Sequence, residues 1–362
     1  MKPRVLIAGG TRYAVPLSPP LRRKFEALAE QLDFRVLARG RADDPRFRLF
    51  PGTSGAAFWA LLPLRIAREL RGFRPAALLA QSPYEAAAAL LARRLARVPA
   101  AVVLDVHGDW RTFTRLYGSP LRRIVSRPAD ALAAWAVRRA DAVRPVSPYT
   151  ERLVRELGVE PAATFPAFMD LDPFLGPVVP LPERPVALFV GVLERYKNVD
   201  GLLEAWRLAS ARLPEAELRI VGRGSLEPLV ARNTLSRGLS WTPQLPTEGV
   251  ASALDAASLL VLPSRSEGMG RIVVEALLRG RPVLATAVGG ITDLVRDGVN
   301  GVLVGSTEPQ ELADALVAAL SDRALLERLA AAARPSVESM LATPEQYAAR
   351  LRELVDGLDL SP

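Results

Sequence analysis

The sequence predicts an α/β protein with two doubly wound domains, each a parallel sheet covered by helices on both faces. Short apolar runs alternate with longer helical patterns from Arg4 to about Pro166, and the alternation restarts at Val186 after a proline-rich passage. Strands separated by helices form βα units, and successive units build a parallel sheet. A chain of 362 residues is long enough to give each of two domains its own core.

The first half alternates strand-like runs with helical patterns. The runs are short and apolar, which is typical of strands buried on both faces of a sheet. The predicted strands span 5–8, 35–38, 76–80, 101–106 and 142–146, and the predicted helices span 21–32, 56–70, 84–97, 121–139 and 148–157. Five prolines from Pro173 to Pro185 then exclude a regular element and indicate a linker.

The second half repeats the alternation and ends in a helix. The predicted strands span 186–190, 217–221, 259–262 and 282–285, and a last helical pattern at 344–358 has no strand after it. We expect domains at 1–175 and 176–343, with residues 344–362 packing back toward the N-terminal domain. Parallel sheets bind ligands at the carboxyl ends of their strands, so a central cleft between the two domains is the expected site.

Composition narrows the function classes. The chain has no cysteine, which excludes disulfides, thiolate metal sites and thiol nucleophiles, and which suits a reducing cytoplasm. Its start lacks the apolar segment of a secretory signal, and no apolar run approaches the ~18 residues of a membrane span. We expect a cytoplasmic protein that is soluble or peripheral to the inner membrane face.

The net charge of +8 has two interpretations. It suggests binding to nucleic acid or to an anionic membrane, but only three of the 47 basic residues are lysines. An arginine-rich composition places most of these charges on a solvated surface, so we expect no nucleic-acid partner. A basic helical face that contacts an anionic membrane remains a hypothesis, with solvated arginines as the alternative, for Arg115, Arg122, Arg123, Arg127, Arg138 and Arg139.

The rest of the chain is organised around residues 263–275, Pro-Ser-Arg-Ser-Glu-Gly-Met-Gly-Arg-Ile-Val-Val-Glu. The stretch joins a strand-like run to a helical pattern, so it is a strand-to-helix turn. Gly268 and Gly270, with Met269 between them, let the backbone approach a ligand, and the helix beyond presents free N–H groups to an anion. Glu267 and Glu275 flank the turn. This combination suits a molecule that carries both phosphate and sugar.

Other candidate residues follow neighbouring strands of the second half. Lys197 is a point-charge partner for a diphosphate, with an exposed helix-start lysine as the alternative, and Arg195 is a second cation beside it. Gly222 and the pair Gly289-Gly290 mark two further strand ends. Because the carboxyl ends of parallel strands lie at one edge, we expect these residues to converge with the two glutamates.

Two features of the first half also lie at predicted strand ends. His107, the only histidine, directly follows the 101–106 strand, where contact with a ligand and a packing role are nearly equal hypotheses. Asp105 and Asp109 flank it without completing a metal set, so no metal is expected. Gly10 belongs to a Gly-Gly-Thr turn after the first strand, which alone is weak evidence for a phosphate loop, and a plain tight turn is the alternative.

Together these residues resemble the retaining glycosyltransferases of the GT-B fold, family 4, also called glycosyl transferases group 1. The resemblance is strongest from Val186 to about Val304. It rests on Glu267-x7-Glu275 inside Pro-Ser-x-x-Glu-Gly-x-Gly, Gly280-Arg-Pro-Val-Leu-Ala285, Val288-Gly-Gly-Ile-Thr-Asp293 and Asp297-Gly-x-Asn300-Gly301. It implies two Rossmann-like domains facing a cleft, a nucleotide-sugar donor, no cofactor, and transfer with retention that needs no divalent ion.

The resemblance also implies residue roles. Glu275 would hold the nucleotide ribose, Glu267 and the amides from Gly268 to Gly270 the transferred sugar, and Lys197 the diphosphate. His107 matches the family's histidine near the sugar hydroxyls, and Gly10 matches its N-terminal glycine turn.

The chain departs from the family pattern at several positions. Val192 stands where an arginine is common, so either Arg195 replaces that arginine or the diphosphate is held less firmly. Asn198 and Pro243 replace common glycines, and Ala167-Phe-Met-Asp170 stands where Asn-Gly-Val-Asp is frequent.

The sequence therefore predicts a retaining hexosyltransferase that moves a sugar from a nucleotide-diphosphate donor to an unidentified glycan, lipid or small molecule. Two other hypotheses are a noncatalytic nucleotide-sugar-binding partner and a GT-B nucleotide-sugar epimerase or hydrolase. The sequence names neither the base nor the sugar of the donor.

Overall fold

The computed structural model describes residues 1–13, 16–40, 44–50, 55–112 and 126–358. These residues form two compact units, and each is described by itself. Unit 1 contains the described residues up to Met169 and those from Ala342 onward, and unit 2 runs from Asp170 to Leu341. Arg115, Arg122 and Arg123 of the expected basic face lie outside the described residues.

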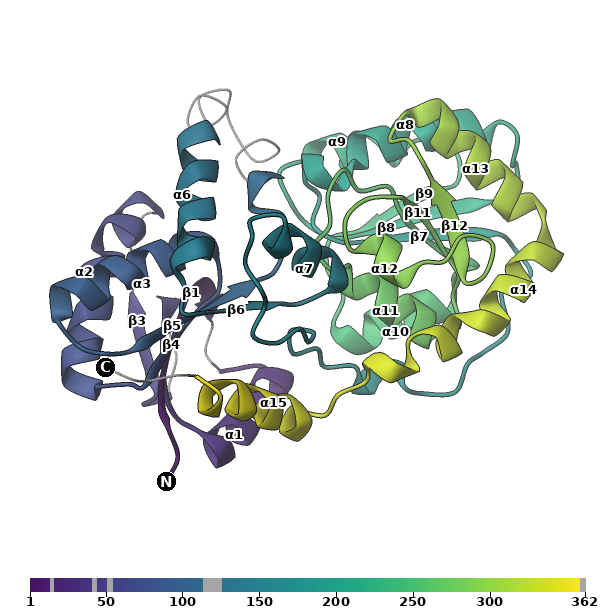
Figure 1. The fold of residues 1–362 in the computed structure, drawn as a ribbon. Coiled ribbons are helices and arrows are strands. Elements are labelled where there is room, and N and C mark those ends of the chain that lie inside the picture. Colours follow the sequence, from purple (N-terminus) through teal and green to yellow (C-terminus); the bar gives the residue numbers. More distant parts are fainter. Residues whose placement is uncertain (14–15, 41–43, 51–54, 113–125, 359–362) are drawn as a thin grey trace. The chain divides into compact units, whose positions relative to one another are not determined.

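Unit 1 is built on a parallel sheet whose described strands run in the order β3-β2-β1-β4-β5-β6 (Figure 1). The order changes direction between β1 and β4, the position where doubly wound sheets bind ligands. The strands β1 to β6 span Arg4–Tyr13, Asp33–Gly40, Phe47–Phe50, Ala77–Ala80, Ala101–Val106 and Ala142–Pro145. The helices α1, α2, α3, α6, α7 and α15 span Pro19–Gln31, Gly55–Phe73, Pro83–Ala96, Ser126–Arg139, Pro148–Arg155 and Pro344–Asp356.

Helices cover both faces of the unit 1 sheet. One core cluster contains Leu78 and Leu104 of the sheet together with residues of α2, α3 and α6. The opposite cluster contains Val103 with residues of α1 and α15, which lie side by side although they are the first and last described helices (Figure 1). α15 begins with a capping box, in which Thr343 and Gln346 satisfy each other's backbone N–H groups.

Unit 2 repeats the architecture, with a described parallel sheet in the order β12-β11-β10-β7-β8-β9. Its switch point lies between β7 and β10. The strands β7 to β12 span Val186–Val190, Glu217–Val221, Leu239–Thr242, Leu259–Leu262, Val283–Thr286 and Gly301–Val304. The helices α8 to α14 span Val199–Ser210, Glu227–Asn233, Thr247–Asp255, Arg271–Leu278, Ile291–Leu294, Pro309–Ser321 and Arg323–Ala333.

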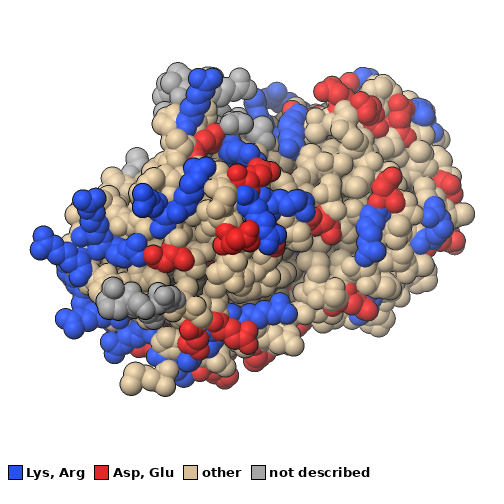
Figure 2. Space-filling model, viewed as in Figure 1, with Lys and Arg blue, Asp and Glu red and all other residues tan. Residues whose placement is uncertain are grey.

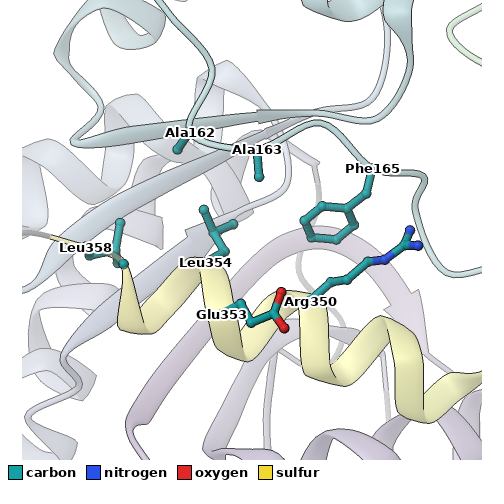
Figure 3. Close-up of a pocket in the computed structure, with 8 residues that line it drawn as sticks. Ala162, Ala163, Phe165, Arg350, Glu353, Leu354 and Leu358 are labelled. Atoms are coloured by element: carbon teal, nitrogen blue, oxygen red, sulfur yellow. The ribbon is translucent and has the colours of Figure 1, made fainter.

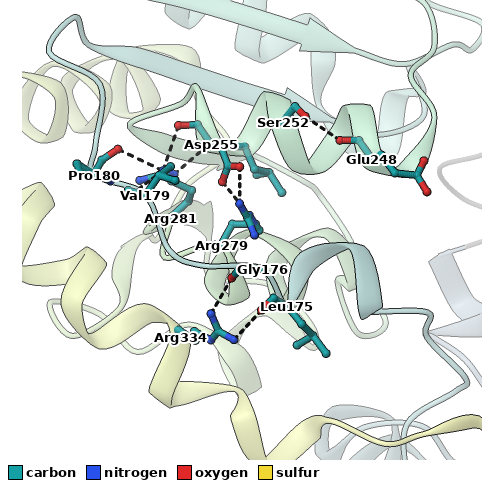
Figure 4. A network of polar contacts seen from close by, with 11 residues as sticks. Leu175, Gly176, Val179, Pro180, Glu248, Ser252, Asp255, Arg279, Arg281 and Arg334 are labelled. Atoms are coloured by element: carbon teal, nitrogen blue, oxygen red, sulfur yellow. Dashed lines mark hydrogen bonds and ion pairs between the residues drawn. The ribbon is translucent and has the colours of Figure 1, made fainter.

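Arginine side chains hold the proline-rich segment that leads into unit 2 (Figure 4). Arg281 is fully buried and donates from Nη2 to the Val179 carbonyl at 2.9 Å. Arg334 donates from Nη1 to the Gly176 carbonyl at 2.9 Å. The segment has few backbone partners of its own, so these donors satisfy carbonyl groups that a helix or strand would otherwise satisfy.

The predicted fold class, α/β with two doubly wound parallel sheets, is confirmed by the topology. Three strands were not predicted, and β3, β9 and β12 are all edge strands with partly exposed residues. The proline-rich passage also contains one short 3₁₀ helix, Asp172–Phe174, where no regular element was expected. Within the described residues, no helix has both the length and the hydropathy to cross a bilayer.

Candidate functional site

The best-supported candidate site lies at the carboxyl ends of β7 and β10, at the switch point of the unit 2 sheet. The turn after β10 ends at Gly270, which has φ 71° and precedes the first residue of α11. Only glycine adopts this left-handed conformation without strain, which explains its position in the motif. The predicted strand-to-helix turn is therefore present, with Glu275 one helical turn inside α11.

Lys197 and Glu267 meet directly across this switch point. They form an ion pair, and the Ser264 hydroxyl donates to the same carboxylate oxygen at 2.9 Å. The side chains of Lys197 and Glu267 keep only 12% and 9% of their surface exposed. The two turns are also joined through the backbone, because the Arg265 N–H donates to the Tyr196 carbonyl at 2.7 Å. A largely desolvated pair of this kind is stable only when both charges are present.

Glu275 is paired with Arg271, one turn earlier in α11. Arg271 donates from Nε to the carboxylate at 2.5 Å and from Nη2 to the Asp170 carbonyl at 3.3 Å. Burial raises the pKa of Glu275, the Arg271 charge lowers it, and Asp170 raises it further. The sequence analysis did not identify Arg271 or Ser264. The i, i+4 spacing of Arg271 and Glu275 was the available signal for the first.

The glycine turns of unit 2 pack against each other at the same edge. A Cβ atom on Gly289, which has φ 54°, would lie 2.0 Å from the Glu267 carbonyl oxygen. A Cβ on Gly290 would lie 2.1 Å from the Gly268 carbonyl oxygen and 3.0 Å from Met269 Cα. A Cβ on Gly222 would likewise lie 1.8 Å from the backbone of the turn after β7. These glycines are thus required by the close approach of the turns.

Gly289→Ala is expected to displace the turn that carries Glu267. The added methyl group collides with a backbone oxygen, and alanine is strained at the left-handed φ of this position. We therefore expect the free energy of unfolding to fall by about 2–4 kcal/mol and ligand binding at this edge to weaken. Thermal unfolding measures the first effect and calorimetry the second. Gly305→Ala is the matched control, since a Cβ there meets no atom within 4 Å. Equal stability of the two variants would contradict the packing argument.

Arg195 and Asn198 lie near Val192, where the chain departs from the family pattern. Arg195 is exposed, and among the described residues its side chain has no hydrogen bond or ion pair, so its charge is available at this edge. Asn198 has φ 54°, a left-handed conformation that glycine adopts readily, and its side chain donates to the Thr307 carbonyl at 3.0 Å. Asparagine tolerates this conformation better than most residues, which explains the replacement.

His107 belongs to unit 1, directly after β5. Its Nε2 lies 4.0 Å from Oδ2 of Asp105, and 41% of its side-chain surface is exposed. Desolvation lowers the pKa of His107, and the neighbouring Asp105 carboxylate opposes that shift. No three His, Asp or Glu side chains gather as a metal site within the part of the chain that the structure describes.

Gly10 does not lie in a turn, which corrects the sequence interpretation. β1 continues to Tyr13, and its pairing with β2 shifts register between Ala8 and Arg12. The Gly10 N–H donates to the Glu85 carboxylate at 2.9 Å. Glu85 is buried, and its second carboxylate oxygen has no hydrogen-bond partner among the residues that the structure describes. The Gly10 amide therefore binds an internal carboxylate, and no sequence pattern pointed to Glu85.

Burial raises the pKa of Glu85, which makes the stability of unit 1 depend on pH. Because the folded carboxyl holds its proton more firmly than the unfolded one, the wild type loses stability as pH rises from about 4 through the folded pKa. Glu85→Gln has no such group. We therefore expect the Tm of Glu85→Gln minus that of the wild type to be more positive at pH 8 than at pH 4. A difference that is constant or falls with pH would contradict the raised pKa.

A cavity of about 300 Å³ lies elsewhere in unit 1, between the segment after α7 and helix α15 (Figure 3). Phe165 and Leu354 supply apolar walls, and Arg350 and Glu353 supply charges. None of the candidate residues at the strand ends lines it.

Comparison with known proteins places both halves of the chain in one enzyme class. Residues 9–166 match the model of the glycosyl transferase 4-like domain, and residues 177–335 match that of glycosyl transferases group 1. The chain is 28% identical over 324 residues to alpha-D-kanosaminyltransferase of Streptomyces kanamyceticus, covering 83% of this chain and 82% of that protein. It is 36% identical over 159 residues to D-inositol 3-phosphate glycosyltransferase of Nocardia farcinica, covering 41% of this chain and 35% of that relative.

Solved structures share the fold along almost the whole chain. Sucrose-phosphate synthase of Thermosynechococcus elongatus superposes with a TM-score of 0.77 at 20% identity, covering 99% of each chain. HepE of Anabaena in complex with UDP-glucose superposes with a TM-score of 0.72 at 18% identity, covering 97% of this chain and 99% of that one. Two parallel sheets of this topology, the two family matches and these neighbours agree: the chain joins a region that matches the glycosyl transferase 4-like domain to one that matches glycosyl transferases group 1, and it is a glycosyltransferase with the GT-B fold.

Proposed function

We propose that the chain is a retaining glycosyltransferase that uses a nucleotide-diphosphate sugar as donor. The observation that carries this proposal is the Lys197–Glu267 ion pair at the switch point of unit 2, next to the Gly270 cap of α11. An ammonium group, a carboxylate and the start of a helix stand together there. We assign the ammonium group to the diphosphate and the carboxylate to the sugar hydroxyls. The helix start faces the phosphate where it joins the sugar.

Each residue of this edge has a proposed role. Glu275 accepts hydrogen bonds from the ribose hydroxyls, and Glu267 with the amides from Gly268 to Gly270 holds the transferred sugar. Lys197 turns from Glu267 toward the diphosphate when the donor binds, and the unpaired Arg195 supplies the charge that Val192 does not. In unit 1, His107 contacts hydroxyl groups of the reacting sugars.

The proposed reaction is a displacement on one face of the sugar. The bond between the anomeric carbon and the diphosphate oxygen breaks, and the acceptor oxygen bonds to the same face of that carbon. The acceptor proton moves to the departing phosphate oxygen, so no protein carboxylate acts as a nucleophile. The cations at the site balance the charge of the leaving group, and we propose that no divalent ion is needed. Loss of transfer activity in the presence of EDTA would contradict the proposal that no divalent ion is needed.

The relatives suggest substrates to test. HepE was solved with UDP-glucose, and the relatives named above carry the names of a kanosaminyltransferase and a D-inositol 3-phosphate glycosyltransferase. We propose a UDP-hexose or a related nucleotide sugar as donor and a polyhydroxylated acceptor.

The test of this function is product analysis by NMR after incubation with nucleotide sugars and an acceptor panel. An axial donor should give an axial glycoside, and an inverted product would contradict retention. Conversion of the donor to an epimer without acceptor would support the epimerase hypothesis instead. Tight donor binding without turnover over the whole panel would support the noncatalytic hypothesis.

We also propose that unit 1 contacts anionic membranes through α2, α3 and α6. Arg127, Arg138 and Arg139 are exposed on α6, and Figure 2 shows basic side chains gathered over the helices of this unit. Large apolar side chains are exposed on the same helices: Trp59 and Leu64 on α2, Leu91 and Leu95 on α3, and Leu132 and Trp135 on α6. Arginine beside exposed tryptophan and leucine is a typical surface for an anionic interface.

Co-sedimentation with vesicles tests the membrane proposal. The wild type should bind phosphatidylglycerol-containing vesicles and not pure phosphatidylcholine vesicles, and binding should weaken as salt rises. Arg138→Glu with Arg139→Glu should reduce binding, whereas Arg207→Glu with Arg212→Glu in unit 2 is the charge-matched control. Equal binding by both double variants would refute a contact through α6.

A further inference from the structure

We propose that Asp105 is a positioning residue for His107, holding the imidazole with its Nε2 proton toward the protein and its Nδ1 lone pair free for a sugar hydroxyl. The assignment rests on the proposed role of His107 in transfer. It concerns residues that neither the family matches nor the names of the relatives assign.

The two oxygens of the Asp105 carboxylate face two different groups. Oδ1 accepts a hydrogen bond from Nε of Arg144 at 2.7 Å, and Oδ2 lies 4.0 Å from Nε2 of His107. The Asp105 side chain is 8% exposed, and the Arg144 side chain is completely buried. A buried carboxylate is thus held on one side by a buried guanidinium and on the other side faces a ring with 41% of its surface open.

The sheet fixes this arrangement. Asp105 and Arg144 are register partners of the parallel strands β5 and β6, so the backbone ladder itself brings the two side chains together. Arg144 also donates from Nη1 to the Phe165 carbonyl at 3.2 Å and lies 4.4 Å from the centre of the Phe165 ring. The guanidinium thus contacts the Asp105 carboxylate, the Phe165 carbonyl and the Phe165 ring. Because Arg144 is held in this way, the Asp105 carboxylate can move little toward any other group.

One further cation, Lys24 on the neighbouring helix α1, contributes to the charge around His107. Lys24 of α1 and Tyr347 of α15 are in contact with each other, since the ammonium lies 5.6 Å from the centre of the tyrosine ring. Arg144 and Lys24 lower the pKa of His107, whereas Asp105 raises it. Asp105 is thus the anion that acts on a ring otherwise near two cations.

The consequence is a defined tautomer. A carboxylate facing Nε2 favours the neutral ring that carries its proton on Nε2, because the N–H dipole then points at the negative charge. Nδ1 is left as a hydrogen-bond acceptor. A distance of 4.0 Å is too long for a hydrogen bond, so the carboxylate acts through its field and by limiting ring rotation.

Nitrogen NMR of the imidazole tests this proposal without any substrate. His107 is the only histidine of the chain, so ¹⁵N-histidine labelling of protein without an added histidine tag gives the ring signals of one residue. We expect the wild type to show the Nε2–H form. In Asp105→Asn the ratio of Nε2–H to Nδ1–H should fall roughly tenfold, and the pKa of His107 should fall as well. A wild type in the Nδ1–H form would overturn the proposal by itself.

A second variant separates positioning from folding. Asp105→Asn leaves Arg144 buried without a counter-ion and is therefore expected to be unstable. Asp105→Asn with Arg144→Met removes both charges at similar volume, and it should keep the fold while showing the same change of tautomer. An unchanged tautomer in this folded double variant would also overturn the proposal. The pKa of His107 is not the readout here, because the losses of Asp105 and Arg144 shift it in opposite directions.

Activity gives the final readout. In the double variant, kcat should fall roughly 10- to 100-fold, while the KM for the donor stays within about threefold, because the proposed partners of the ribose and the diphosphate, Glu275 and Lys197, belong to unit 2. An unchanged kcat would overturn the positioning role. If no transfer is found for the wild type while the tautomer changes as expected, the proposed function fails and the geometry of His107 stands.

Discussion

Glu275→Ala is expected to weaken nucleotide-sugar binding by about 100- to 1,000-fold. Hydrogen bonds to a charged group contribute about 1.5–3 kcal/mol each, and a ribose offers two hydroxyls. With each bond at about 1.5–2 kcal/mol, the lower part of this range, the loss amounts to about 3–4 kcal/mol. The carboxylate is 8% exposed and is already oriented by Arg271, so it loses little side-chain entropy when the donor binds. Isothermal titration calorimetry with the donor measures the effect.

The matched control for this prediction is Glu204→Ala. Glu204 also forms an ion pair within a helix of unit 2, with Arg207, but it is half exposed and lies on α8. An exposed pair of this kind contributes about 0–1 kcal/mol, so this variant should bind donor as the wild type does. Donor affinity that is equal in Glu275→Ala and Glu204→Ala would remove Glu275 from the site.

Lys197→Met is expected to lower kcat by about 100- to 1,000-fold, with a smaller effect on donor affinity. The charge of the departing diphosphate develops in the transition state, and a positioned cation stabilises it more there than in the bound donor. The substitution also leaves Glu267 without its ion-pair partner. Initial rates at varied donor concentration measure kcat and KM separately.

Two companion variants make the lysine prediction specific. Lys2→Met removes an exposed lysine that only donates to the Ala29 carbonyl, and it should leave both constants unchanged. Lys197→Met with Glu267→Gln removes both charges of the buried pair, so it should regain stability lost in the single variant without regaining activity. Recovery of kcat in that double variant would show that Lys197 acts only by neutralising Glu267.

The central strands of the fold could be predicted closely, because their sequence signal comes from burial. β5, β7, β8 and β10 occupy the predicted residues, and each is a run of mostly buried apolar side chains. The edge strands β3, β9 and β12 are four residues long and each contains partly exposed or exposed positions, so they lack the continuous buried run of the central strands. Their pairing depends on neighbouring strands that a local pattern does not reveal.

The sequence predicted which residues form the candidate site, but it did not predict which of them contact each other. The positions of Lys197, Glu267 and Glu275 follow from glycine-marked strand ends, yet the ion pair between Lys197 and Glu267 joins residues 70 apart in the chain. The bond from Gly10 to Glu85 spans 75 residues, and its donor lies within a strand where the sequence predicted a turn. Contacts of this range depend on sheet order, which the sequence pattern left undetermined. The roles assigned to these residues stay predictions.

Thermal unfolding of the wild type in the presence of nucleotide sugars tests the central claim most directly. The claim is that the edge formed by Lys197, Glu267 and Glu275 binds a nucleotide-diphosphate sugar. UDP-, GDP- and ADP-sugars are compared with the free sugars, and a ligand present at 100 times its Kd should stabilise the protein by about 2.7 kcal/mol. We predict that at least one nucleotide sugar raises the Tm and that the shift is lost in Glu275→Ala. No shift with any nucleotide sugar, or a shift that Glu275→Ala retains in full, would contradict the claim.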